Sequence, residues 1–209
     1  MRLLYGTYNP AKLAAMRSWL DMPVSLIGLS ELESLPADVE ETGETPLENA
    51  CIKARAYCRA SGMLTLAADS ALYLEGLSDA EQPAVHARRV GGTRMNDEEM
   101  IGHYAGLVHA HGGRMTARYR NGACVMHPDG RMLTRFDDSL ASAPFYLVDT
   151  PHPQRTKGFP LDSLSVHIES GQYYYDLGDA RMDADLPQRD GFRTFVREAI
   201  EMFAHEDDL

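Results

Sequence analysis

Residues 40–54, EETGETPLENACIKA, carry the clearest local structural signal in the chain. Thr45 can cap a helix with its side chain, and Pro46 suits the first helical position. Glu48 follows the cap by three residues and can return a hydrogen bond to it. This pattern predicts a helix that begins at Pro46 and runs up to Gly62, where glycine ends it.

The same stretch contains polar residues that could support chemistry. Asn49 and Lys53 are four residues apart, so they share one face of the predicted helix. Glu40 and Glu41 lie just before the helix, where their carboxylates could hold a hard cation. An acidic surface loop without a ligand is the alternative interpretation.

An apolar run follows the helix and predicts a strand over residues 63–68, with Asp69 and Ser70 directly after it and another short strand at 71–74. A carboxylate in this position lies at the carboxyl end of a strand. Ligands gather at that end in open α/β sheets. A turn that Asp69 caps together with Ser70 is the alternative.

The beginning of the chain predicts a strand at residues 2–6 and a helix at 10–21. Asn9 precedes a proline and is typical of a helix cap. The N–H groups of a helix N-terminus form a natural phosphate site, to which Thr7, Asn9 and Lys12 could add side-chain contacts. Asn9 acting only as a cap, with Lys12 solvated, is the alternative.

The rest of the chain adds mostly strands, and then a final helix. The elements predicted there are a helix at 96–110, strands at 114–126, 131–136, 145–148 and 173–175, a long loop at 149–162 and an amphipathic helix with an apolar stripe from 192 to 203. Alternating strands and helices followed by a strand-rich middle predict an α/β fold.

Composition narrows the classes of function. The chain has 209 residues, 44% of them hydrophobic, and a formal net charge of −11. An acidic protein is a poor ligand for nucleic acid polymers or anionic membranes, because phosphate neutralisation supplies most of that affinity. No apolar run approaches the roughly 18 residues that a membrane helix needs.

The three cysteines are Cys51, Cys58 and Cys124. They are odd in number and lack the close pairing of metal ligands. Reduced, buried thiols in a cytoplasm are the interpretation that we adopt.

In order and spacing, these motifs resemble the noncanonical purine nucleoside triphosphate pyrophosphatases, also called inosine triphosphate pyrophosphatases. Four motifs of that family, the Thr-Gly-Asn-x-x-Lys phosphate loop, the Glu-Glu-Thr-Gly stretch, Ala-Asp-Asp-Ser-Gly-Leu and Pro-Gly-Val-x-Ser-Ala-Arg, correspond to residues 7–12, 40–54, 68–72 and 83–89. The resemblance is specific over residues 1–92 and faint afterwards.

The resemblance implies a fold, a reaction and partners. The fold is an elongated mixed β-sheet flanked by helices, with two lobes around a central cleft, here as a single domain over residues 1–209. The reaction converts a nucleoside triphosphate and water into a monophosphate and pyrophosphate, with Mg²⁺ as the cofactor. The expected protein is a cytoplasmic homodimer that binds a nucleoside triphosphate, with no nucleic acid polymer and no membrane as partner.

The resemblance also assigns roles to individual residues. Asp69 is the expected catalytic base, and Glu40 and Asp69 are the expected metal ligands. The substrate-binding residues that it implies are Thr7, Asn9, Lys12 and Lys53 for the phosphates, Ser70 for a further substrate contact, and Phe159, Asp162 and Arg189 for the base.

Several positions depart from the family pattern. Ala68 replaces one of two adjacent aspartates, a second aromatic residue after Phe159 is missing, and Arg189 alone is left of a basic base-reading group. These changes predict altered base specificity. Two alternatives stay open: a nucleotide-binding or protein-interaction protein of this fold with impaired catalysis, and a Maf-type pyrophosphatase or other phosphate-ester hydrolase.

Overall fold

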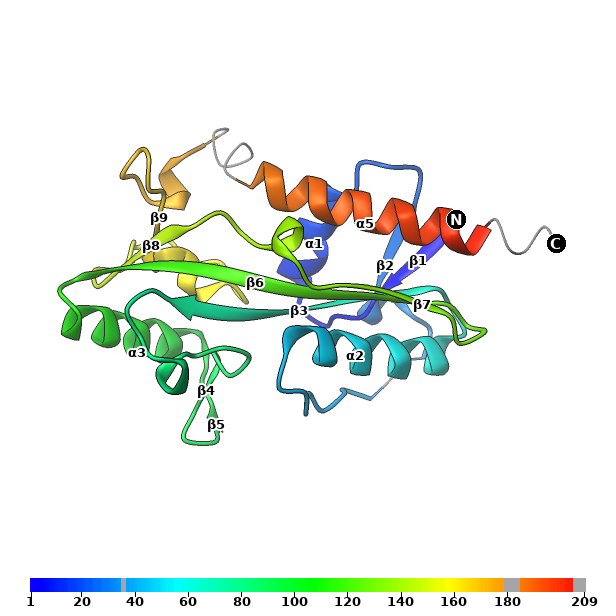
Figure 1. Cartoon of the computed structure of the whole chain (residues 1–209), viewed down its shortest axis with the longest axis horizontal. Coiled ribbons are helices and arrows are strands. Elements are labelled where there is room, and N and C mark those ends of the chain that lie inside the picture. Colours follow the sequence, from blue (N-terminus) through cyan, green and yellow to red (C-terminus); the bar gives the residue numbers. More distant parts are fainter. Residues whose placement is uncertain (35–36, 179–184, 205–209) are drawn as a thin grey trace. The chain divides into compact units, whose positions relative to one another are not determined.

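The computed structural model describes residues 1–34, 37–178 and 185–204 (Figure 1). The helices are α1 (Pro10–Trp19), α2 (Pro46–Ser61), α3 (Asp97–Ala110) and α5 (Leu186–Ala204). The strands are β1 (Arg2–Tyr5), β2 (Ser25–Gly28), β3 (Thr65–Leu74), β4 (Arg89–Val90), β5 (Thr93–Arg94), β6 (Arg114–Met126), β7 (Met132–Arg135), β8 (Phe145–Val148) and β9 (Ser165–Val166). The 3₁₀ turns used below are η4 (Pro160–Leu164) and η5 (Tyr174–Asp176).

The main sheet is mixed. Its strand order is β2-β1-β3-β6-β8-β9, with β7 also paired to β6. β1 runs parallel to both β2 and β3, whereas β6 pairs antiparallel with β7 and β8. This arrangement, together with the helices, confirms the predicted mixed α/β fold.

The chain divides into two compact units. Unit 1 comprises residues 1–70, 120–141 and 187–209, and unit 2 comprises residues 71–119 and 142–186. The division falls within β3 and within β6, so each of these strands contributes residues to both units. That residues 1–209 form a single domain stays a prediction.

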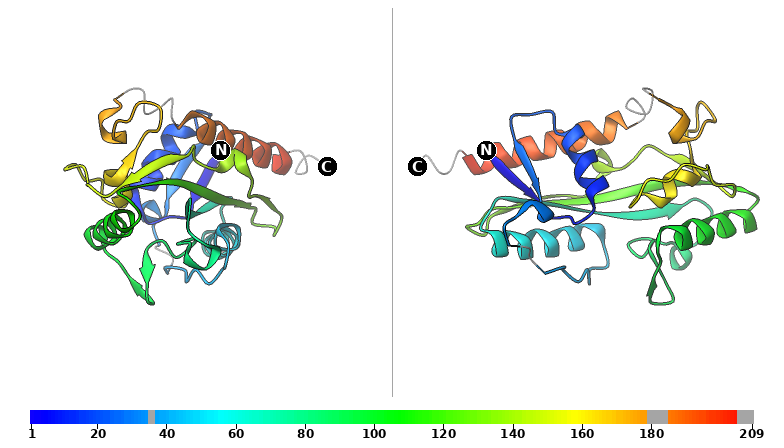
Figure 2. Two further views of the ribbon diagram at one scale, coloured as in Figure 1. Left: turned by 60° about the vertical axis from the view of Figure 1, so that its left-hand side comes forward. Right: turned by 180° about the vertical axis from the view of Figure 1, so that it is seen from behind.

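In unit 1, α1 and α5 cover one face of the sheet and α2 covers the other (Figures 1 and 2). On the first face, Phe195 of α5 packs in one apolar cluster with Leu66 of β3. On the second, small α2 residues such as Ala54 pack against β3 and β6. Each fully buried Leu or Phe side chain stabilises this core by about 2 kcal/mol.

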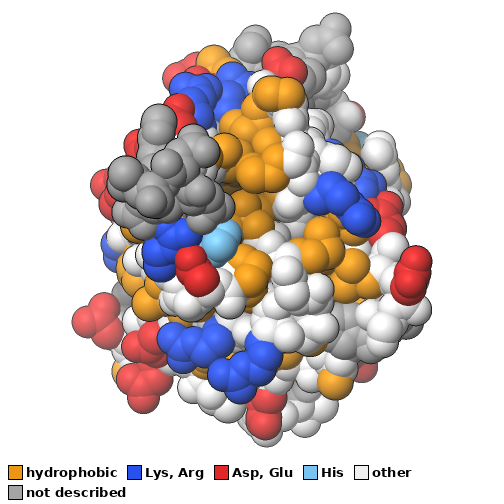
Figure 3. Space-filling model, turned by 90° about the vertical axis from the view of Figure 1, so that its right-hand side faces the viewer, with side chains coloured by type: hydrophobic (Ala, Val, Ile, Leu, Met, Phe, Trp, Pro, Cys, Tyr) orange, Lys and Arg blue, Asp and Glu red, His pale blue; other side chains and the backbone are white. Residues whose placement is uncertain are grey.

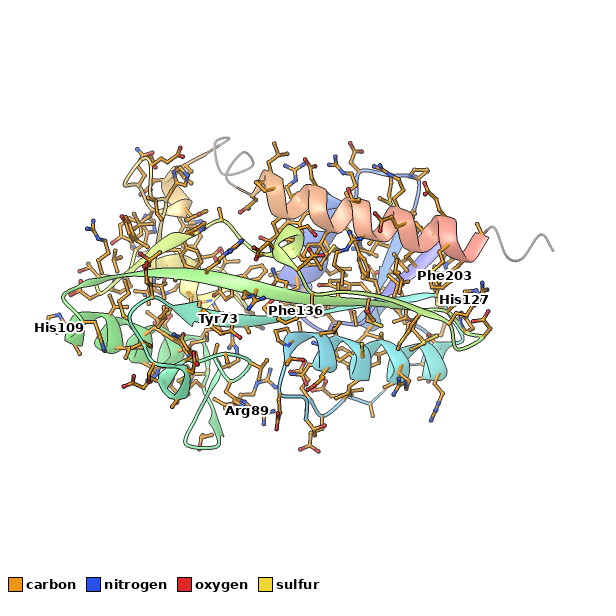
Figure 4. The ribbon with its side chains drawn as sticks, in the orientation of Figure 1. Tyr73, Arg89, His109, His127, Phe136 and Phe203 are labelled. Carbon is orange, nitrogen blue, oxygen red and sulfur yellow. The ribbon has the colours of Figure 1, made fainter. Side chains whose placement is uncertain are left out.

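The close approach of α2 to β6 depends on Gly122. A Cβ at this position would lie 2.4 Å from the backbone nitrogen of Leu47. At the far end of the same unit, His127 stacks on Phe203 of α5, with ring centroids 5.3 Å apart (Figure 4). The first contact fixes α2 against β6, and the second fixes α5 against the residue that follows β6. Helix α2 is the one that positions the candidate site.

Unit 2 has its own core around α3. Tyr104 and Val108 of α3 are buried with Leu147 of β8 and Leu164 of η4. The Tyr104 hydroxyl donates a hydrogen bond of 2.9 Å to the carbonyl of Ala87. The apolar packing of Leu164 secures η4, which carries part of the predicted base-binding segment.

The predicted helices are confirmed, with α1 ending two residues early and α5 extending beyond its apolar stripe. The strand prediction around Asp69 is wrong: β3 continues through Asp69 and Ser70 to Leu74. The strand does not need to end there, because partners on α2 satisfy the buried carboxylate. None of the helices described is long and apolar enough to cross a membrane.

The strand predicted at residues 173–175 is also wrong, because this segment leads into the 3₁₀ turn η5. The Tyr173 hydroxyl donates to the carbonyl of Thr150, and the Tyr175 hydroxyl bonds to the Thr156 hydroxyl. An isolated β-bridge from Tyr173 to Val166 and side-chain hydrogen bonds to the 149–162 loop therefore hold this segment, without a continuous strand.

Candidate active site

Helix α2 presents two polar side chains to the interior of unit 1. Asn49 is 2% exposed and Lys53 is 8% exposed, one turn further along. Their buried neighbours on the helix include the small apolar residues Ala50 and Ala54. An amide and an ammonium group buried in this way need hydrogen-bonding and charged partners.

Lys53 lies between two carboxylates. Its Nζ is 2.6 Å from Oε1 of Glu41 and 3.2 Å from Oδ1 of Asp69. It also donates to the backbone carbonyl of Ala68 at 3.0 Å. With all three side chains ionised, the group of Lys53, Glu41 and Asp69 carries one net negative charge, which favours a cation nearby.

Asp69 is held on the α2 side of β3. Its Oδ2 accepts a hydrogen bond of 3.1 Å from Nδ2 of Asn49, and its Oδ1 accepts the one from Lys53. Because side chains alternate along a strand, the neighbouring Ala68 faces the opposite way and packs on the apolar cluster that contains Leu66. Alanine at this position therefore removes no partner from the face that holds Asp69.

The predicted phosphate loop joins β1 to α1. Oδ1 of Asn9 accepts hydrogen bonds from the backbone N–H groups of Ala11 at 2.9 Å and Lys12 at 3.3 Å, so Asn9 caps α1. The Asn9 backbone N–H donates to the Thr7 hydroxyl at 3.1 Å. Part of the donor set of this helix N-terminus is therefore used within the loop itself.

The loop lies beside β3 and α2. The backbone N–H of Gly6 donates to the carbonyl of Leu66, in line with the parallel pairing of β1 and β3. A Cβ on Gly6 would lie 2.8 Å from the ring of Tyr57 on α2, which makes glycine necessary there. Tyr8 meets the Tyr57 ring edge-on, with centroids 6.4 Å apart. Three segments that are remote in sequence thus meet within unit 1.

Two tyrosines around this region stay protonated at neutral pH. Burial and the charge of Asp69 both raise the pKa of Tyr5. Burial, with Asp38 nearby, raises the pKa of Tyr57 to about 12. Neither phenol therefore adds negative charge beside Asp69.

The structure does not bring every predicted residue to this group. Glu40 is exposed, and no hydrogen bond or ion pair links it to Asp69 in the part of the chain that is described. Ser70 alternates to the other face of β3, and Arg189 lies half-buried in α5. Among the residues described, no three His, Cys, Asp or Glu side chains form a metal-binding group by themselves.

The predicted base-binding residues Phe159 and Asp162 belong to unit 2. The backbone N–H of Asp162 donates to the carbonyl of Phe159 at the start of η4. Just before them, the Gly158 N–H donates to Oδ2 of Asp97 on α3 at 2.9 Å. Their role toward a base stays a prediction.

The sequence suggested that Glu41, like Glu40, could hold a cation, but the metal ligands implied by the family resemblance did not include Glu41, and Asn49 had no assigned role. The structure places Glu41 against Lys53 and Asn49 against Asp69. The spacing of Asn49 and Lys53 was the available signal, because it put both on one helix face. No sequence rule separates Glu41 from the adjacent Glu40 in an irregular loop.

The sequence of the chain is similar to a family of nucleoside triphosphate pyrophosphatases. The sequence model of the Ham1 family matches residues 3–160. A dITP/XTP pyrophosphatase of Corynebacterium efficiens is 31% identical over 177 residues, which cover 81% of this chain and 80% of that protein. One from Rhodopseudomonas palustris is 32% identical over 167 residues, covering 78% and 75%.

The chain therefore belongs to the Ham1 family, the noncanonical purine NTP pyrophosphatases that its motifs resemble. The HAM1 protein of Coxiella burnetii has the same fold, with a TM-score of 0.71 at 24% identity, covering 95% of this chain and all of that one. The Ham1 protein of Staphylococcus aureus superposes with a TM-score of 0.67 at 20% identity, over 95% and 99% of the two chains. The family model and the sequence relatives favour the Ham1 family over the Maf-type alternative.

Proposed function

We propose that this protein hydrolyses noncanonical purine nucleoside triphosphates to the monophosphate and pyrophosphate in a Mg²⁺-dependent reaction. The relatives named above as dITP/XTP pyrophosphatases support the substrate class. The single observation that carries the proposal is the buried Asp69 carboxylate, which shares Lys53 with a second carboxylate, that of Glu41.

The residues present fit Mg²⁺. Carboxylate oxygens are its preferred protein ligands, and it is commonly held by one or two carboxylates plus substrate phosphates. Asp69 and Glu41 would supply the carboxylates. Glu40 is the ligand that the family resemblance implies, but its neighbour Glu41 makes the ion pair in this group. When bound, the metal neutralises charge on the phosphate oxygens.

The side chains around the group then have separate tasks. Lys53, Lys12, Thr7 and the Asn9 amide bind the phosphates. Asp69 accepts a proton from water as the water oxygen forms a bond to the α-phosphorus. The bond from that phosphorus to the bridging oxygen breaks, and pyrophosphate leaves with the electron pair. Positioning and positive charge supply most of the catalysis in such transfers.

The base is read by other residues. We assign stacking to Phe159, hydrogen-bond acceptance to Asp162, a basic contact to Arg189 and a substrate contact to Ser70. The missing second aromatic residue supports a base preference different from that of the relatives.

A substrate panel tests the function. Purified protein is given ITP, dITP, XTP, modified purine triphosphates and the standard nucleotides, with Mg²⁺ or EDTA, and pyrophosphate and orthophosphate are measured separately. We expect pyrophosphate with a monophosphate, in Mg²⁺ only. Calorimetric binding of dITP or XTP without turnover would instead indicate the impaired binding protein.

The proposal extends to assembly and location. On the face in Figure 3, hydrophobic side chains gather in a band with Lys and Arg side chains near it, which supports a homodimer. Light scattering distinguishes a 23.2 kDa monomer from a particle of twice that mass.

All three cysteines are free thiols, which supports a reducing cytoplasm.

A further inference from the structure

The Asn49 side chain joins two parts of the candidate site through its two polar atoms. Its Oδ1 accepts a hydrogen bond of 2.8 Å from the backbone N–H of Gly43, and its Nδ2 donates one of 3.1 Å to Oδ2 of Asp69. The backbone N–H of Gly43 can only donate, so it fixes the carbonyl side of the amide. The NH₂ group must then point at Asp69.

The segment before α2 packs closely against the first turn of the helix. A Cβ on Gly43 would lie 2.6 Å from Cβ of Glu48 and 2.8 Å from Oδ1 of Asn49. The next two backbone N–H groups, of Glu44 and Thr45, donate to Oε2 of Glu48 at 2.7 and 3.3 Å. The segment that leads from Glu41 to α2 is thus attached to the first turn of the helix at several points.

Asp69 is held by one donor at each oxygen. Asn49 donates to Oδ2, and Lys53, one helical turn later, donates to Oδ1. Two donors on a single rigid helix determine the rotation of the carboxylate plane. Catalytic geometry is sensitive to such orientation, because small displacements of a reacting group cost large factors in rate.

We propose that Asn49 is a positioning residue for the hydrolysis: it orients the Asp69 carboxylate and ties that orientation to the segment that carries Glu41. The inference rests on the proposed function, because it acts through Asp69. Aspartate at position 49 has the same shape but cannot donate to Asp69. Glutamine has the donor but is one methylene longer.

The experiment compares Asn49→Asp and Asn49→Ala with wild type in pyrophosphate release, and repeats Asn49→Ala in an Asp69→Asn background. We expect kcat to fall about 10²-fold in both single variants while KM changes much less. In the Asp69→Asn background, Asn49→Ala should cost less than about twofold, because the group that it positions is already gone.

Asn121 provides a matched control. It is a buried asparagine of unit 1 whose Nδ2 donates 2.7 Å to the carbonyl of Leu140 on the other face of the unit. Asn121→Ala should lower the melting temperature and leave kcat of the folded protein near wild type. If Asn49→Ala does not fold, the isosteric Asn49→Asp variant decides the question.

Four results would overturn different parts of the proposal. Wild-type kcat in a folded Asn49→Asp variant would overturn the positioning role. An equal loss from Asn49→Ala with and without the Asp69 carboxylate would overturn it as well, because Asn49 would then act independently of Asp69. Full activity in Asp69→Asn alone would overturn Asp69 as the base, whereas no pyrophosphate release from the wild type with any triphosphate would overturn the proposed function.

Discussion

Each unit of the molecule contains an aspartate whose two carboxylate oxygens both accept hydrogen bonds. In unit 1, Asp69 receives donors from Lys53 and Asn49. In unit 2, Oδ1 of Asp97 accepts a hydrogen bond of 2.6 Å from the Arg88 guanidinium, and Oδ2 accepts one of 2.9 Å from the Gly158 N–H. Each carboxylate has two hydrogen-bond donors, so the number of hydrogen bonds does not distinguish the two sites.

Charge and exposure distinguish them. The Asp97 side chain is 32% exposed and forms a pair of equal and opposite charges with Arg88. The Asp69 side chain is 11% exposed and shares Lys53 with Glu41, so its surroundings have an excess of one carboxylate. A balanced pair fastens a loop to a helix, whereas an excess of one carboxylate beside the buried Asp69, with the Glu41 side chain 39% exposed, is suited to a cation that enters from solvent. The chemistry that we propose is therefore assigned to unit 1.

The largest expected effect is the loss of kcat when the Asp69 carboxylate of unit 1 is removed. Asp69→Asn should lower kcat for dITP or XTP about 10³-fold, because the proton acceptor and a metal ligand are both lost. Pyrophosphate release measures the rate, and circular dichroism confirms the fold. An Asp69→Asn variant with the wild-type rate would rule out the assigned base.

The next effect is a loss of stability when Lys53, the cation shared by two carboxylates, is replaced. Lys53→Met keeps the aliphatic stem but leaves Asp69 and Glu41 without their common partner, so the free energy of unfolding should fall by about 3 kcal/mol. Urea unfolding measures this loss. Unchanged stability would show that the ion pairs contribute nothing to folding.

A paired test then distinguishes two adjacent carboxylates. Glu41→Gln should raise the Mg²⁺ concentration for half-maximal activity about tenfold, because a neutral amide is a weaker ligand for a hard cation. Glu40→Gln is the matched control and should leave it unchanged. The reverse result would restore Glu40 as the ligand.

In unit 2, Asp97→Asn should lower the stability of the folded protein at neutral pH and leave kcat near wild type. Burial opposes ionisation, but hydrogen bonds from the Gly158 N–H and Arg88 outweigh it and hold the pKa of Asp97 below its ordinary value. Stability gained this way is present at neutral pH and is lost as pH falls below about 4. Melting temperatures of the two proteins should therefore differ at pH 7 and converge in acid.

The smallest effect concerns a thiol on α2. A hydrogen bond from Cys124, opposed by burial and assisted by Arg55, lowers the pKa of Cys51 to about 7. Iodoacetamide should therefore alkylate Cys51 with a half-maximal rate near that pH. Cys124→Ala should move the midpoint toward the ordinary thiol range, and a midpoint that stays in place would refute the thiol–thiol contact.

The sequence allowed local features to be predicted well. The limits of α2 followed from Thr45, Pro46 and Gly62, because caps and stops act on adjacent residues. The continuation of β3 through Asp69 could not be predicted, because only the tertiary partners on α2 make a carboxylate acceptable inside a strand. The choice between Glu40 and Glu41 depends in the same way on where a loop places each side chain.

The central claim is that the Asp69 and Glu41 carboxylates of unit 1 hold a divalent cation for a nucleoside triphosphate. Anomalous diffraction from crystals grown with Mn²⁺ and a non-hydrolysable dITP analogue tests it directly. We expect a Mn²⁺ peak within coordination distance, about 2.2 Å, of oxygens from both carboxylates. A peak bound elsewhere, away from Asp69, would contradict it.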